Sequence, residues 1–133
     1  MSKEEKLLNE WQERLGLLDW AIALRYNYEL EDLNLTNACA ETNFESTTKT
    51  AIIRMVKPEL VAGRLLDYDF EKTLVHELMH IKLSLLNIEP NSLVNSILEC
   101  AIHQLVDDLA RALVMAKRGE TKRKLAYKKV EKV

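Results

Sequence analysis

The pattern that most constrains this chain is HELMH at residues 76–80, in which His76 and His80 lie four positions apart. On an α-helix, residues four apart lie one turn apart on the same face, so both imidazoles can reach a single ion. Neutral imidazole nitrogens are good zinc ligands at about 2.0–2.1 Å. Mostly apolar residues surround the pattern, which predicts a buried helix over about residues 70–86.

Glu77 stands directly after the first histidine, where it can contact a zinc-bound water rather than the metal. As a general base, it would take a proton from that water during attack on a carbonyl and then pass it to the leaving amine. HExxH is a short pattern that also occurs by chance. The alternative is a helix whose two partly buried histidines bond to carboxylates of the core. The favoured interpretation is a site for one Zn²⁺ ion.

A catalytic zinc usually has three protein ligands and a water. Glu99 is the predicted third ligand, because the 19 residues after His80 leave room for a helix end, a turn and an antiparallel helix. It also lies in an apolar stretch, SILECAIHQLV, where an unpaired carboxylate would be costly to bury.

His103 is one turn beyond Glu99 and faces the same direction, so it is the alternative third ligand. We favour for it a catalytic role beside the metal, either polarising the carbonyl or orienting a ligand. Asp107 lies a further turn along this face. It can hold a histidine in place or form a structural ion pair.

The remaining patterns predict a compact α+β domain. Residues 3–15 have the spacing of an amphipathic helix, and residues 20–30 alternate as in a half-buried strand. Residues 38–44 and 50–56 are expected to be two strands joined by a polar turn. We expect a three-stranded, mainly antiparallel sheet, with the HExxH helix packed against a long C-terminal helix. That helix is predicted over about 93–117 from an apolar repeat: Leu93, Ile97, Ala101, Leu105 and Leu109.

The length of 133 residues fits one domain, predicted over residues 1–116. Residues 117–133 form a basic extension with eight Lys or Arg against two Glu. Such an extension can attract nucleic acid, although a solvated or frayed helix end is the favoured interpretation. No apolar stretch is long enough for a transmembrane helix, and the charged N-terminus lacks a signal-peptide pattern, so a cytoplasmic protein is expected.

The HExxH pattern followed by Glu99 on the next helix resembles the gluzincin clan, the thermolysin-like zinc peptidases. The short chain, with strands directly before that helix, is most similar to minigluzincins and related small phage or bacterial peptidase-like proteins. The similarity covers the segments WQERLGLLDWAIAL, DFEKTLVHELMHIKLSLL and ECAIHQLVDDLARAL and the hairpin between the first two. The resemblance implies a zincin-like fold, with His76, His80 and Glu99 as zinc ligands and Glu77 as general base and acid.

This chain departs from the larger gluzincins in two ways. Those enzymes have an acidic residue one turn after the ligand Glu, where this chain has His103, and they carry a large C-terminal domain. The predicted function is a zinc-dependent peptidase acting on a peptide or protein, with residues 38–44 as the strand that pairs with an extended substrate. The alternatives are an inactive zinc-containing binding or regulatory module and a nucleic-acid-associated protein. The oligomeric state is not predicted.

Overall fold

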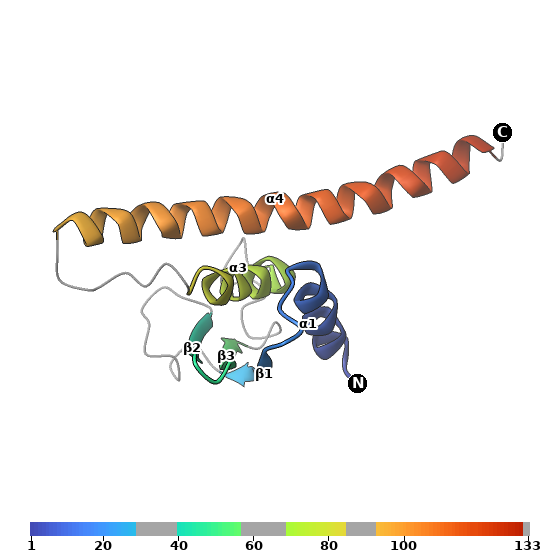
Figure 1. Cartoon of the computed structure of the whole chain (residues 1–133). Coiled ribbons are helices and arrows are strands. Elements are labelled where there is room, and N and C mark those ends of the chain that lie inside the picture. The colour runs from blue at the N-terminus through green and yellow to red at the C-terminus, as the bar shows by residue number, and fades with distance from the viewer. Residues whose placement is uncertain (29–39, 57–68, 85–92, 132–133) are drawn as a thin grey trace.

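The computed structural model describes residues 1–28, 40–56, 69–84 and 93–131. The described part is an α+β fold, as predicted. Its elements follow one another along the chain as α1 (Lys3–Arg14), β1 (Ala21–Tyr28), β2 (Ala40–Glu45), β3 (Thr50–Val56), α3 (Phe70–Lys82) and α4 (Leu93–Glu131). Figure 1 shows α3 between the sheet and α4, with α1 beside α3. The predicted segment ends at 29–30, 38–39, 85–86 and 132–133 lie outside the described residues.

The sheet is mixed, so the prediction of a mainly antiparallel sheet is wrong. Its strand order is β1-β3-β2, with β2 antiparallel and β1 parallel to β3. The turn after Glu45 fixes β2 and β3 as antiparallel neighbours. β3, with the sequence TAIIRMV, is the most apolar strand, and Ala51, Ile53 and Met55 on it are buried. It therefore takes the centre of the sheet and leaves β1 and β2 at the edges.

Helix α1 matches the predicted range, and its ends explain why. The Ser2 hydroxyl accepts a hydrogen bond from the Glu5 backbone N–H at 3.1 Å, and the Glu5 carboxylate accepts one from the Ser2 N–H at 3.3 Å. This reciprocal capping box satisfies donors that the first helical turn leaves unpaired. Gly16, with φ of 70°, takes the left-handed conformation after the helix.

Helix α3 is the centre of the hydrophobic core. Leu74, Val75, Leu78 and Ile81 on this helix are almost completely buried. They belong to one buried cluster with the inner side chains of β3 and with three residues of α4: Val106, Ala110 and Val114. Because α3 is apolar toward both neighbours, it joins the sheet layer to the α4 layer.

Helix α4 is longer than predicted, continuing from Leu93 to Glu131. The apolar repeat that predicts this helix is not the face that packs on α3, because Ile97 is 64% exposed and Leu105 is 51% exposed. The packed face is instead the buried stripe through Val106 and Ala110. Two apolar stripes on one helix have the same period, so periodicity alone could not show which one is buried. None of the described helices combines the length and apolar character needed to cross a membrane.

A charged network ties α4 to α1 and α3, and we call it the Glu71 clamp. The buried carboxylate of Glu71 accepts hydrogen bonds from the Trp11 indole Nε1 at 2.8 Å and from the Lys117 ammonium. Arg118 forms a bidentate pair with Asp69, with N–O distances of 2.6 and 3.0 Å. Lys117 and Arg118, the first residues of the predicted basic extension, therefore contact the α1–α3 layer directly.

The clamp favours the ionised form of Glu71. Burial opposes ionisation of this carboxyl, but the hydrogen bonds from Lys117 and Trp11 outweigh it, so the pKa of Glu71 is lower than its ordinary value of 4.5. The ionised form is the one that folding stabilises. Its contribution to stability is complete above pH 4.5 and is lost as the pH falls through the lowered pKa of the folded state.

We therefore expect Glu71→Gln to lower the free energy of unfolding by about 2 kcal/mol at pH 7, because Lys117 then loses a partly buried anionic partner. The difference from the wild type should shrink as the pH falls below 4.5, since the native carboxyl then becomes neutral too. Urea unfolding followed by circular dichroism across this pH range measures both effects. Glu13→Gln, at an exposed position of α1, is the matched control and should change stability by less than about 0.5 kcal/mol. An equal loss in both variants would contradict the clamp.

Candidate metal centre

The HExxH pattern lies on α3, as predicted. The helix starts at Asp69, whose carboxylate accepts a hydrogen bond from the Lys72 backbone N–H at 3.2 Å. This cap stabilises the start of the helix, and because both residues lie on the helix, His76 and His80 are one turn apart on the same face. Their ring centroids are 4.9 Å apart.

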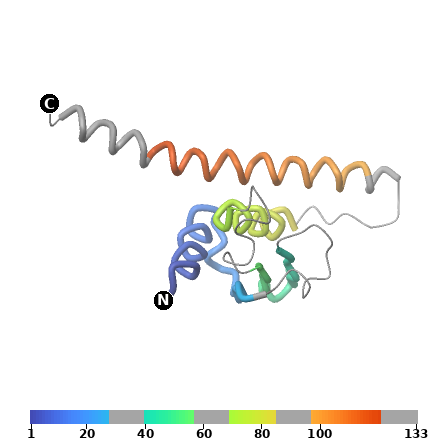
Figure 2. Tube along the Cα trace, turned by 180° about the vertical axis from the view of Figure 1, so that it is seen from behind, coloured from blue at the N-terminus to red at the C-terminus, as the bar shows by residue number. Residues whose placement is uncertain are grey.

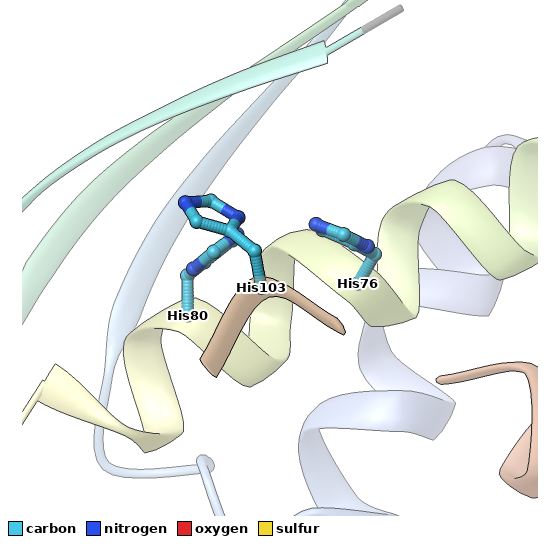
Figure 3. Close-up of side chains that lie close together, drawn as sticks. All are labelled: His76, His80 and His103. Carbon is cyan, nitrogen blue, oxygen red and sulfur yellow. The ribbon is translucent and has the colours of Figure 1, made fainter. Parts of the chain in front are cut away.

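A third imidazole, from His103 of α4, joins the two histidines of α3 (Figure 3). Its ring centroid lies 4.8 Å from that of His80 and 6.5 Å from that of His76. The three residues offer one ligand nitrogen each, and these atoms all lie within 4.8 Å of one another. Nitrogens bound tetrahedrally to one zinc would lie about 3.3 Å apart, so small side-chain rotations would complete the site.

Glu99, the predicted third ligand, lies on α4 one turn before His103 and is exposed. Glu99 is assigned to the metal partly because an unpaired carboxylate would be costly to bury in an apolar stretch. Since the residue is exposed, that reason for the assignment does not apply. Within the described residues, the group that could hold a metal contains His103 and not Glu99. The assignment of Glu99 to the metal stays a prediction, while the three-histidine alternative is the one that the side-chain positions favour.

The two histidines of α3 are held in the neutral form that metal binding requires. Burial lowers the pKa of His76, and it lowers the pKa of His80 to about 4 with help from the neighbouring His76 and His103. At neutral pH both imidazoles therefore keep a free lone pair. Together with His103 they supply three imidazole nitrogens, a donor set that suits zinc.

Asp107 lies behind His76, one turn along α4 from His103. Its Oδ1 is 3.5 Å from His76 Nδ1, which leaves the Nε2 of His76 as the nitrogen available to an ion. Burial opposes the ionisation of Asp107, but Lys72 and Arg111 outweigh it and lower the pKa of this carboxyl. A carboxylate behind a histidine is the usual arrangement that fixes ring orientation at a metal. The structure shows both predicted roles of Asp107, because this carboxylate lies beside His76 and also forms ion pairs with Arg111 at 2.9 Å and Lys72 at 3.5 Å.

Glu77 is buried and faces β2 rather than α4. Its carboxylate accepts a hydrogen bond from the Thr42 hydroxyl, a contact between residues 35 positions apart. Burial raises the pKa of Glu77; the Thr42 bond partly opposes this, and the nearby Glu41 adds to it. Thr42 was missed by the sequence analysis, because nothing in a strand of alternating residues indicates which hydroxyl will meet the helix.

No protein-family model matches the chain, and comparison with curated proteins and with solved structures gives no match either. The resemblance to gluzincins consequently has no relative that tests it.

The third ligand can be identified by comparing two single variants. We expect His103→Ala to weaken zinc binding at least about 100-fold, because it removes one of three converging nitrogens. Glu99→Ala should leave zinc affinity nearly unchanged, since the carboxylate is exposed and outside the histidine group. Competition with a chromogenic chelator at pH 7 measures both affinities. Loss of zinc in Glu99→Ala with retention in His103→Ala would instead establish the ligand set that the sequence pattern predicts.

In the metal-free protein, the imidazole of His80 should titrate near pH 4 instead of near 6.5. Burial and two neighbouring imidazoles disfavour its charged form, so the proton is taken up only in stronger acid. Carbon-bound ring protons of histidine, followed by NMR from pH 3 to pH 8 and assigned with His80→Gln, report this midpoint. A midpoint near 6.5 would show that the ring is solvated.

Proposed function

We propose that this chain is a zinc-dependent peptidase in which His76, His80 and His103 hold one zinc ion and Glu77 is the general base. The observation that carries the proposal is the convergence of three imidazoles from two helices, beside a buried carboxylate. A structural pair of core histidines would be bonded to buried carboxylates. Among the described residues, the carboxylate paired with a histidine of α3 is that of Asp107, whose side chain is 38% exposed rather than buried.

Zinc bound at this site would supply Lewis acidity, which lowers the pKa of water to about 7 and polarises a carbonyl group. The protein's own groups supply the remaining chemistry. Glu77 has a pKa raised by burial, which brings its basicity closer to the working pH of a proton-transfer group. It can accept a proton from the attacking water and return it to the leaving amine.

The sheet edge beside Glu77 supports a peptide as substrate. Among the described strands, β2 lies at an edge, and its residue Thr42 contacts Glu77 directly. An extended peptide can pair with such an edge through backbone hydrogen bonds, and this brings its carbonyls past the general base. The predicted substrate strand, residues 38–44, overlaps β2.

An inactive zinc-binding module differs from this proposal only in lacking turnover, so activity measurements separate the two. The nucleic-acid alternative is less well supported, because Lys117 and Arg118 are engaged in the Glu71 clamp and their charges are partly neutralised there. The cytoplasmic location stays a prediction from the N-terminal sequence.

We expect Glu77→Gln to keep zinc and to lower kcat/KM by about 100-fold to 10,000-fold, because the amide cannot accept the proton. Elemental analysis and cleavage of a fluorogenic peptide library measure the two properties. Glu13→Gln removes an exposed carboxylate from α1 and should leave cleavage unchanged. Full activity in Glu77→Gln would contradict the mechanism, and zinc binding without cleavage by the wild type would favour the binding module.

Thr42→Val should shift the acidic limb of the kcat/KM profile to higher pH. The hydroxyl of Thr42 lowers the pKa of Glu77, so its removal raises that pKa further and the base is ionised only at higher pH. Thr42→Ser keeps the hydroxyl and should restore the wild-type profile. An unchanged limb in Thr42→Val would show that Thr42 is structural only.

A further inference from the structure

Phe44 differs from its neighbours on the face of the sheet that packs against α3. The side chains of the central strand on this face, Ala51, Ile53 and Met55, are buried. Phe44 lies on the same face, because it is the register partner of Ala51, yet it is 41% exposed. Among the described strand residues it is the large apolar side chain that this face leaves exposed.

The ring of Phe44 packs against the indole of Trp20. The ring centroids are 6.3 Å apart and the planes meet at 78°, the edge-to-face arrangement that aromatic pairs prefer. Trp20 directly precedes β1 and packs against the buried core. Ala51, the side chain of β3 next to Phe44, is a single methyl group, which leaves room for the two rings to meet across the central strand. We call this pair of rings, Trp20 and Phe44, the aromatic ledge.

The aromatic ledge lies close to the proposed general base. Thr42 precedes Phe44 by two residues on the same face of β2, and its hydroxyl donates a hydrogen bond to Glu77. Residues two apart on a strand are about 7 Å apart along it. The strands lie on the side of α3 away from α4, so the ledge and Thr42 both face the helix that carries Glu77 (Figure 2).

We propose that the aromatic ledge selects the substrate, with Phe44 in contact with a large apolar side chain close to the bond that is cleaved. This inference rests on the proposed function, in which an extended peptide pairs with the edge of β2. The peptide residue opposite Phe44 projects to the same face, with its Cβ about 4.5–5.5 Å from that of Phe44. Contact removes apolar surface of both side chains from water, so the preferred substrates carry Leu, Phe or a similar residue there.

The alternation of a strand confines this preference to one position of the peptide. The peptide residues opposite Asn43 and Glu45 project to the other face of the sheet, away from the ledge. The residue opposite Thr42 lies beside Glu77, about 7 Å from the one opposite Phe44. The apolar residue therefore stands two positions from the one beside the general base.

Positional series of peptides test the proposal with the zinc-loaded full chain. In each series one position carries Phe, Leu, Ala or Asp and the others are fixed. We expect one position at which kcat/KM for Phe and Leu exceeds that for Ala by at least about 10-fold. In Phe44→Ala this ratio should fall below about threefold, while peptides with Ala at that position are cleaved as well as by the wild type.

Two further variants are the controls. Ile52→Ala removes a side chain that is 37% exposed on the opposite face of the sheet, and should keep the wild-type ratio. Phe44→Leu keeps an apolar surface and should retain most of the preference. Equal far-UV circular dichroism and equal zinc affinity show that each variant keeps its fold and its metal centre. In Phe44→Ala, an unchanged ratio or an equal fall in kcat/KM for all peptides would overturn the ledge as the determinant of specificity.

Peptide binding separates this inference from the proposed function. Fluorescence polarisation of dye-labelled peptides with zinc-loaded Glu77→Gln measures dissociation constants without turnover. A constant at least about 10-fold lower for Leu than for Ala, lost when Phe44→Ala is added, would support the ledge. If the wild type cleaves none of these peptides, the same binding result leaves the ledge in place and only the proposed function fails. Cleavage without any apolar preference would leave the proposed function and overturn the ledge, and neither binding nor cleavage would overturn both.

Discussion

The attachment of α4 to α3 is the constraint on which the candidate metal centre depends. His76 and His80 come from α3, but His103 comes from a helix that could lie at many angles to it. Two contacts fix that angle: the buried stripe of α4 and the Glu71 clamp, which begins 14 residues after His103. The clamp joins charges that are partly shielded from water, where an ion pair with several hydrogen bonds is stronger than one on an open surface. A site built from two helices therefore draws its precision from interactions about 20 Å away along α4.

The same arrangement shifts the pKa values of two carboxyls on α3 in opposite directions. The pKa of Glu71 is lowered because Lys117 and Trp11 outweigh its burial, whereas burial raises the pKa of Glu77, six positions along the same helix, and the hydrogen bond from Thr42 only partly offsets this. The environment, not the residue type, distinguishes the carboxylate of the clamp from the one proposed for proton transfer. This separation of pKa values along a single helix is common where acid–base chemistry occurs.

Much of the fold could be predicted from local patterns. The ends of α1 follow from the Ser2–Glu5 box and Gly16, the hairpin follows from two apolar runs around a polar turn, and the histidine pair follows from a spacing of four on α3. What could not be predicted depends on contacts between distant elements. The parallel pairing of β1 with β3, the contact of Thr42 with Glu77 and the choice between two apolar stripes on α4 all arise from packing. The assignment of Glu99 as third ligand rests on its 19-residue spacing from His80, on its apolar surroundings and on the gluzincin resemblance, and it stays a prediction; only the expected burial of Glu99 is not produced by the packing of α4.

Ala110, the smallest side chain in the packed stripe of α4, influences how far His103 lies from α3. Ala110 is completely buried against α3, two turns beyond His103. A straight helix moves as a stiff rod, so a bulkier side chain at this point would lift α4 and carry the imidazole of His103 with it by a similar amount. Metal–ligand distances vary by only a few tenths of an ångström, so in the proposed zinc site the methyl group of Ala110 would set the separation of His103 from the two histidines of α3. A bulkier side chain at this position would therefore disturb the proposed coordination geometry as well as the packing of the core.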